Sequence, residues 1–274
     1  DVALRTILNP GDEVIYHEPC FVSYRPSIIL AGGVPVCVET RREDQFRLTR
    51  DMLEKAVTPK TRVLMLNFPC NPTGAVLGQK DVEDIADFCK THDLLLLTDE
   101  IYAELTYESK HVSFISVPGM KERTIFLHGM SKAWAMTGFR IGYACAPAEV
   151  SENMMKLHQY AIMSAPTTGQ KAAAEALERG DAAVAEMVAE YNRRRNYLIA
   201  AFADMGVPCH TPAGAFYAFP YIGDLGVSSE EFAMRFLEEH GVAVVPGDAF
   251  GQSGAGFLRC AYATSMDNIR EAMA

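Results

Sequence analysis

A run of four leucines, Leu94–Leu97, limits most strongly what this chain can fold into. The run has no polar residue at every second position, so a strand formed by it must be covered on both faces. Helical patterns alternate with such strands; over residues 80–90, for example, apolar residues recur at i, i+3, i+4 and i+7. Strands and helices that alternate in this way connect by right-handed crossovers. The sequence therefore predicts an α/β fold with a mostly parallel sheet.

Polar residues follow three of the expected strands at the point where each strand ends. Asn71 comes after the apolar stretch 62–67, Asp99 after the leucine run, and Lys132 after the apolar stretch 124–127. Ligands of such sheets bind beyond the carboxyl ends of the strands. We therefore expect these three side chains to lie along one edge of the sheet.

The pattern changes to mainly helical from about residue 151, which indicates a second domain. Ser228 followed by Glu231 is a capping box that opens one of its helices. The elements we expect there are helices over 184–205 and 230–240 and strands over 215–219, 242–245 and 256–262. We place the boundary near residue 178, which gives a large domain over 1–178 and a smaller C-terminal α+β domain over 179–274.

The formal charge of −10 argues against nucleic acid or an anionic membrane surface as a partner, because both require basic patches. The basic cluster Arg193–Arg195 lies in a helical pattern near Glu186 and Glu190, so we interpret it as a solvated helix face. No apolar run approaches the roughly 20 residues that span a bilayer. We expect neither nucleic acid nor a membrane as a partner.

Seven cysteines are widely spaced, without a C-x-x-C pair, and predict neither a disulfide framework nor a zinc site. A reducing compartment, and hence a cytoplasmic location, is the expectation. The sequence starts without methionine in a helical pattern, residues 1–8, and stops inside another, residues 269–274. We therefore expect a fragment that is cut inside an element at both ends.

Lys132 is an unusual loop lysine. Lysines in loops are mostly solvated, yet this one is flanked by Met130, Ala133, Trp134 and further apolar residues. Such surroundings desolvate an amine, which lowers its pKa and makes it a nucleophile toward aldehydes. Lys132 is therefore a candidate catalytic residue.

The stretch around Lys132 resembles the cofactor-lysine segment of the class I and II aminotransferases, the fold-type I enzymes that use pyridoxal 5′-phosphate. The family pattern is Ser-Lys followed by Gly-(Trp/Phe)-Arg-hydrophobic-Gly, and residues 131–132 and 138–142 match it. By this resemblance Lys132 bonds covalently to the cofactor, whereas Ser131 and Arg140 bind its phosphate.

Further residues match the family in the same order along the chain. Asp-x-x-Tyr is found here as Asp99 and Tyr102, and the family's Asn-Pro-x-Gly starts at Asn71. The resemblance implies that Asp99 keeps the cofactor's ring nitrogen protonated, while Tyr102 and Asn71 bond its phenolic oxygen. It also implies that Phe21 stacks on the ring. Taken alone, Asp99 is more typical of a helix cap or a turn, and Phe21 of a core residue.

Arg259 lies inside an otherwise apolar strand, where a charge is hard to explain by packing. It matches the family's arginine for the substrate α-carboxylate, and Asn71 belongs to the same substrate site by this resemblance. No arginine other than Arg140 lies between Lys132 and Arg179, so a dicarboxylate substrate would need another anchor. The resemblance also implies that the segments supplying a phosphate-binding loop and a cross-dimer tyrosine belong upstream of residue 1.

The resemblance implies an aminotransferase, a homodimer that moves an amino group between an L-amino acid and a 2-oxo acid such as 2-oxoglutarate. Aspartate, an aromatic amino acid, alanine or a diaminopimelate derivative would be the donor. A carbon–sulfur lyase on the same scaffold, or an aminotransferase-like sensor domain of a transcription regulator, would carry the same residues. The run 133–138 looks most like the stand-alone aminotransferases, which favours the first interpretation.

Overall fold

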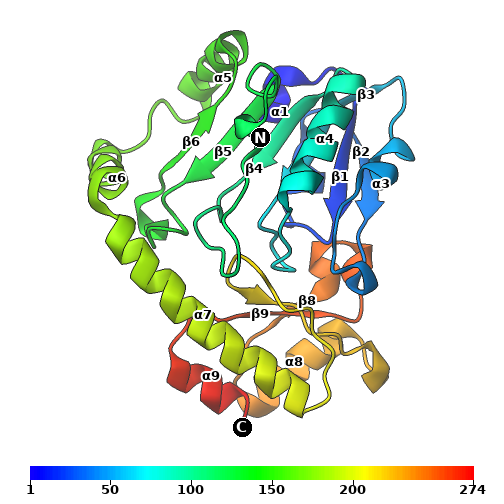
Figure 1. Cartoon of the computed structure of the whole chain (residues 1–274), viewed down its shortest axis with the longest axis vertical. Coiled ribbons are helices and arrows are strands. Elements are labelled where there is room, and N and C mark those ends of the chain that lie inside the picture. Colours follow the sequence, from blue (N-terminus) through cyan, green and yellow to red (C-terminus); the bar gives the residue numbers. More distant parts are fainter.

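The computed structural model describes the whole chain, residues 1–274. Its larger sheet has six strands in the order β2-β1-β3-β4-β5-β6 (Figure 1). The first five strands of this order are parallel, and β6 is antiparallel to β5. The strands are β1 (Glu13–Glu18), β2 (Val34–Glu39), β3 (Thr61–Asn67), β4 (Leu95–Asp99), β5 (Thr124–Gly129) and β6 (Gly142–Cys145). The mostly parallel α/β sheet predicted from the sequence is confirmed.

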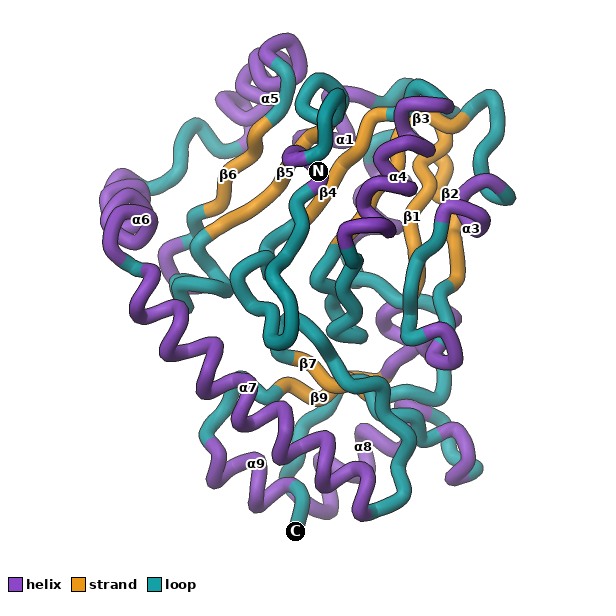
Figure 2. The backbone as a smooth tube through the Cα atoms, in the orientation of Figure 1, coloured by secondary structure: helices purple, strands orange, loops and turns teal.

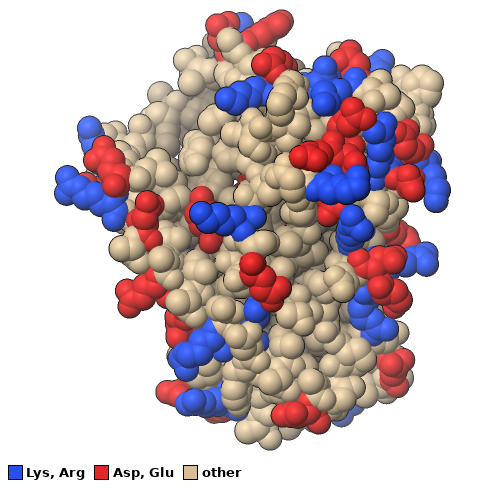
Figure 3. Space-filling view, viewed as in Figure 1, with Lys and Arg blue, Asp and Glu red and all other residues tan.

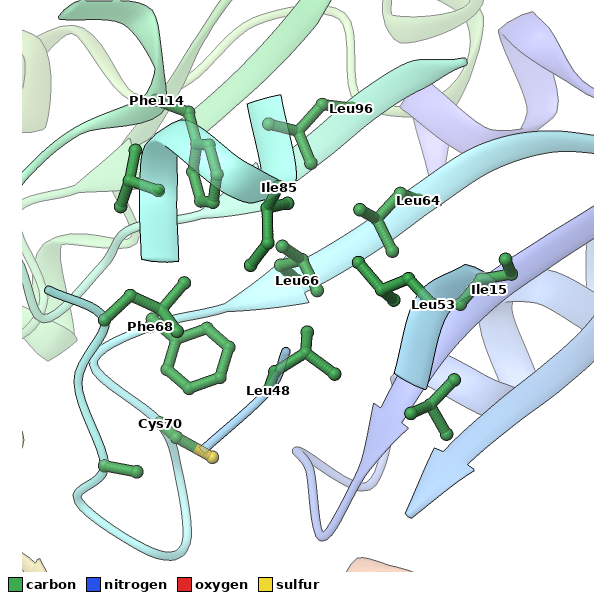
Figure 4. Packing of buried hydrophobic residues seen from close by; sticks show 14 of the residues in the cluster. Ile15, Leu48, Leu53, Leu64, Leu66, Phe68, Cys70, Ile85, Leu96 and Phe114 are labelled. Carbon is green, nitrogen blue, oxygen red and sulfur yellow. The ribbon is translucent and has the colours of Figure 1, made fainter. Parts of the chain in front are cut away.

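The leucine run explains why β4 lies at the centre of this sheet. Leu96 belongs to a cluster of 23 buried residues on one face, and Leu97 to a cluster of 11 buried residues on the other. Figure 4 shows Leu96 together with Ile85 and Phe114 in the larger cluster. Because both faces are packed, an alternation of polar and apolar residues would have buried unpaired polar groups in this strand.

Helices cover both faces of the larger sheet. The larger cluster includes residues of α3 (Arg50–Glu54) and α4 (Gln79–Thr91), and the smaller one residues of α1 (Val2–Ile7) and α2 (Tyr24–Leu30). Val82, Ile85, Ala86 and Cys89 of α4 are all buried, as their helical spacing predicts. α5 (Ala148–Ala161) contacts α1 and has no fully buried residue.

The C-terminal part of the chain contains a small antiparallel sheet, β7-β9-β8, with helices beside it (Figure 2). Its elements are α6 (Thr167–Arg179), α7 (Asp181–Asp204), β7 (Tyr217–Ala218), α8 (Ser229–His240), β8 (Val245–Pro246), β9 (Leu258–Ala261) and α9 (Met266–Ala272). The Ser228 hydroxyl accepts a hydrogen bond from Glu231 N at 3.1 Å, so this half of the predicted capping box is confirmed, whereas the Glu231 side chain does not bond back to Ser228 N. β7 is shorter than expected because Ala215 has a positive φ of 58°, which interrupts the extended backbone.

One surface expectation is wrong. Arg193 and Arg194 pair with Glu190 on the surface of α7, as expected of a solvated face, but Arg195 is only 5% exposed. Arg195 donates to the carbonyl of Pro212 at 2.8 Å and lies over the ring of Tyr107. Because α7 extends beside both sheets, this third arginine points inward and ties the helix to two loops.

None of the helices is long and apolar enough to cross a membrane. On the face drawn in Figure 3, acidic and basic side chains are interspersed and do not form one continuous basic patch.

Candidate active site

The ends of β3, β4 and β5 meet at the same edge of the larger sheet, as the sequence predicts. Asn67, at the end of β3, pairs with Asp99 at the end of β4. The side-chain amide of Asn67 donates to the carbonyl of Asp99 at 2.9 Å, and its oxygen accepts from Asn71 N at 3.1 Å. Asn67, which sequence analysis did not single out, thus fixes two of the expected site residues relative to each other.

Asp99 is a half-buried carboxylate with no cationic partner within 4.0 Å. Tyr24 OH donates to its Oδ2 at 2.7 Å, and Ile101 N donates to its Oδ1 at 3.1 Å. Burial raises the pKa of Asp99, and these two hydrogen bonds and the nearby His128 oppose that rise. A carboxylate in this environment favours a ligand that brings a positive charge to it.

Lys132 is half-buried, and its amine has no hydrogen-bond or ion-pair partner in the chain. The rings of Tyr102 and Phe216 have their centroids 6.0 and 5.7 Å from Nζ. Burial lowers the pKa of Lys132; Arg259 and Arg140 lower it further, and Asp99 opposes them. These electrostatic effects connect Lys132 with three other expected site residues.

Two aromatic residues of the C-terminal part approach Tyr102, and sequence analysis did not assign either to the site. The hydroxyl groups of Tyr102 and Tyr217 are 3.1 Å apart, and the ring of Phe216 meets Tyr102 edge-on. Burial and the neighbouring Tyr217 raise the pKa of Tyr102, so it stays protonated. The sequence shows Phe216 and Tyr217 only as part of a strand, because their approach to residue 102 is a tertiary contact.

Arg259 extends from β9 toward the edge of the larger sheet. Its Nη1 donates to Asn71 Oδ1 at 3.1 Å, and its guanidinium lies between the rings of Tyr217 and Phe250, at 4.5 and 4.8 Å. Its buried Nε has no partner, and no carboxylate lies within 4.0 Å of it. A held but unpaired guanidinium is suited to bind a carboxylate ligand.

The remaining expected residues are less enclosed. Arg140 is exposed, and its side chain donates only to the carbonyl of Thr137, at 2.9 Å. Ser131 is half-exposed and its hydroxyl has no protein partner. Phe21 is 39% exposed and meets the ring of Tyr24 edge-on, which places it beside the tyrosine that bonds Asp99.

Comparison with known proteins decides the family of this chain. The family model described as aminotransferase class I and II matches residues 1–274. The chain belongs to this family. The resemblance noted around Lys132 is therefore confirmed at the level of the family.

An aromatic-amino-acid aminotransferase of Thermococcus litoralis is 50% identical over 99% of this chain and 71% of that protein. An aspartate aminotransferase of Pyrococcus abyssi is 49% identical over the same shares. The crystal structure of an aromatic aminotransferase from Pyrococcus horikoshii superposes with a TM-score of 0.97, at 49% identity, over 99% of this chain and 73% of that one. This chain is an aminotransferase, and the lyase and the regulator domain are not favoured.

Proposed function

We propose that this aminotransferase uses pyridoxal 5′-phosphate, bonded to Lys132. The observation that carries the proposal is two half-buried charges at the sheet edge that have no ion-pair partner: the carboxylate of Asp99 and the amine of Lys132. These residues fit a ligand that has a protonatable ring nitrogen and an aldehyde. When bound, this cofactor supplies the electron sink that makes the α-proton of an amino acid acidic.

Asp99 holds the proton on the ring nitrogen. Its carboxylate costs free energy when it is buried without a cation, so it stabilises the positive charge of a protonated ring beside it. Tyr24 OH and Ile101 N hold the two carboxylate oxygens in place, which limits the rotation of the Asp99 side chain. The charge is thus oriented before any ligand arrives.

Lys132 is the group that moves the substrate's α-proton. Burial and the neighbouring arginines lower its pKa, so a larger fraction of the amine is neutral at a given pH than for a solvated lysine. A neutral Nζ both attacks an aldehyde and accepts a proton. The rings of Tyr102 and Phe216 restrict the access of water to this amine.

Arg259 and Asn71 bind the α-carboxylate of the amino acid and orient its Cα–H bond. The hydrogen bond to Asn71 and the two flanking rings hold the guanidinium in one position. Ser131 and Arg140 bind the cofactor phosphate, Tyr102 and Asn71 its phenolic oxygen, and Phe21 stacks on its ring. Free donors on Ser131 and Arg140 support this assignment.

We further propose that the donor is an L-amino acid such as aspartate, an aromatic amino acid, alanine or a diaminopimelate derivative. The acceptor is a 2-oxo acid such as 2-oxoglutarate. The names of the relatives at about 50% identity support aromatic and aspartate donors. The boundary between the domains lies near residue 178, beside the junction of α6 and α7. The enzyme works as a homodimer in the cytoplasm, where its seven cysteines stay free.

The test is an amino-transfer assay of the complete protein supplied with pyridoxal 5′-phosphate. Each donor is incubated with 2-oxoglutarate, and glutamate and the 2-oxo acid of the donor are measured together. Equal amounts of the two products are expected from the wild type, and almost none from Lys132→Ala. Release of ammonia or of a thiol in place of glutamate would contradict the proposal, as would normal turnover by Lys132→Ala.

A further inference from the structure

A buried carboxylate that the proposed mechanism does not use, Glu18, lies at the end of β1. It is only 8% exposed, and its Oε1 accepts a hydrogen bond from Tyr16 OH at 2.7 Å. No lysine, arginine or histidine nitrogen lies within 4.0 Å of it, and its Oε2 accepts no hydrogen bond within the chain. A buried carboxylate in this state attracts a cationic group.

Glu18 lines a cavity of about 570 Å³ between the ends of β1 and β2, α2 and the loop after β8. Two more carboxylates, Glu39 and Asp248, line the same cavity, and Arg25 is the one cation among its lining residues. None of these four side chains has an ion-pair partner. The formal charge of the cavity wall is therefore −2, from three carboxylates and one guanidinium.

The loop after β8 brings its backbone against Glu18. A Cβ atom added to Gly251, which has a φ of 117°, would lie 2.2 Å from Glu18 Oε2. Cys20 N donates to the carbonyl of Phe250 at 3.0 Å, which holds this loop to the end of β1. The absence of a side chain at residue 251 thus lets the loop pack against the carboxylate, which remains at the wall of the cavity.

The cavity adjoins the expected substrate site through one side chain. Phe250 lines the cavity, and its ring lies 4.8 Å from the guanidinium of Arg259. Phe21, on the same wall, is the expected stacking residue of the cofactor. A substrate whose carboxylate binds Arg259 would therefore lie next to Phe250, a residue that also lines this cavity.

We propose that this cavity binds the ammonium or guanidinium group at the far end of a basic amino-acid side chain. This inference rests on the proposed function. The His, Cys, Asp and Glu residues of the cavity are not grouped closely enough to hold a metal ion, so an extended organic cation fits better. The ring of Phe21, which is 39% exposed, offers an apolar surface to the methylene groups of such a side chain. Among the donors considered above, a diaminopimelate derivative with a free distal amine has such an end.

The thiol and the phenol beside Glu18 add no charge to the cavity wall. Burial and the Glu18 carboxylate raise the pKa of the Cys37 thiol to about 12, so this thiol stays protonated. Burial and the same carboxylate also raise the pKa of Tyr16. Arg25, at the rim, leaves two carboxylates in excess and can bind a carboxylate next to the distal amine.

The test compares matched donors with the complete, cofactor-loaded enzyme. L-Lysine and L-norleucine differ in the terminal ammonium group, and L-ornithine and L-norvaline form a second such pair. The wild type should use the charged member at least about tenfold better in kcat/KM, because a charge-assisted hydrogen bond is made only by that member. Glu18→Gln should reduce this ratio about tenfold, and the exposed variant Asp248→Asn by a smaller factor in the same direction.

A second measurement is independent of turnover. Calorimetric titration of the cofactor-free protein with putrescine should detect binding that is weakened in Asp248→Asn and more so in Glu18→Gln. Glu239→Gln, an exposed ion-pair residue on α8, serves as the control and should match the wild type. If norleucine is used as well as lysine, or if the ratio survives in both cavity variants, the inference is wrong and the proposed function stands. If no donor is used, the proposed function fails, and putrescine binding alone decides whether the cavity takes a cation.

Discussion

The two halves of the candidate site differ in how firmly the chain holds them. At the ends of β3, β4 and β9, the side chains of Asn71, Asp99 and Arg259 have hydrogen bonds to residues far apart in the sequence. The turn that carries Lys132 and Arg140 is closed mainly by short-range backbone bonds, such as Ala135 N to Lys132 O at 3.1 Å. We call the first half the buried half: Asn71 is buried, and Asp99 and Arg259 are half-buried but held by these long-range contacts. In the turn, Lys132 is half-buried as well, and Arg140 is exposed.

This difference indicates where each part of the chemistry is prepared. Charges that act on the reacting atoms must be oriented before the substrate arrives, and long-range contacts provide that orientation. A phosphate needs only donors that can adapt to it, which an exposed turn supplies. The turn is nevertheless anchored, because Trp134 and Met136 pack against Met130 and Ile141. The variants described next should therefore have larger effects in the buried half than in the turn.

The largest effect after loss of Lys132 is expected for Asp99→Asn. Removal of a preoriented charge should lower kcat about 100- to 1,000-fold, by analogy with other electrostatic contacts in active sites. Cofactor binding should persist, because Asp99 is one of several contacts. Measurement of kcat together with cofactor affinity checks both statements. Near-normal turnover would mean that Asp99 has only a structural role, as a cap.

The same variant has a consequence for stability. Burial raises the pKa of Asp99 above its unfolded value of 3.8. At a pH between 3.8 and the raised pKa, the native cofactor-free chain therefore binds more protons than the unfolded chain. Its free energy of unfolding therefore has a component that falls as the pH rises through the raised pKa. Asp99→Asn should lack this component and be more stable than the wild type at neutral pH. Urea unfolding at several pH values measures it.

Arg259→Gln should lower kcat/KM for all amino acids by about 10- to 100-fold, because a charge-assisted hydrogen bond to a carboxylate contributes about 1.5–3 kcal/mol. The loss should be similar for donors with different side chains, since the α-carboxylate is common to them. Arg235→Gln, an exposed arginine on α8, is the matched control. A loss confined to one donor would mean that Arg259 recognises a side chain.

In the turn, two substitutions of Arg140 separate the effect of its charge from the effect of its backbone conformation. Both Arg140→Gln and Arg140→Gly should weaken cofactor binding by about tenfold, because both remove the guanidinium. Arg140 has φ 54° and ψ 46°, a left-handed conformation. The glycine variant should therefore be more stable than the glutamine variant, by about 1 kcal/mol. Fluorescence titration with the cofactor measures the affinity, and thermal unfolding measures the stability. A loss of cofactor affinity as large as the loss of turnover in Asp99→Asn would contradict the contrast between the two halves of the site.

The smallest expected effect concerns the pKa of Lys132 in the cofactor-free protein. Arg259 lowers this pKa more than Arg140 does, and Asp99 raises it. The pH midpoint for acylation of Lys132 should therefore rise in Arg259→Gln, rise less in Arg140→Gln, and fall in Asp99→Asn. Mass spectrometry of the labelled peptide across a pH series measures the midpoint. Equal shifts in the two arginine variants would show that Arg140, in the turn, acts on the pKa of Lys132 as strongly as Arg259 does.

The sequence predicted the larger sheet well and the smaller one only in outline. Leu94–Leu97 could be placed because an uninterrupted apolar strand has few other environments, and Leu96 and Leu97 do face opposite clusters. The strands expected over 215–219 and 242–245 are shorter in the structure, because the backbone turns at Ala215 and β8 includes only Val245 and Pro246. Arg195 was misinterpreted because helical periodicity does not show which loops approach α7.

What the sequence determined by itself is the position of the reactive residues along the chain. Asn71, Asp99 and Lys132 follow strand ends, and parallel strands bring such ends to one edge whatever the loops do. Tertiary structure alone decided the neighbours of these residues: Tyr24 on Asp99, Phe216 near Lys132, and Phe250 between Arg259 and the Glu18 cavity. The reason is physical. Periodicity along a chain reports which face of an element is buried, whereas a contact between elements depends on how the domains pack, which no local pattern records.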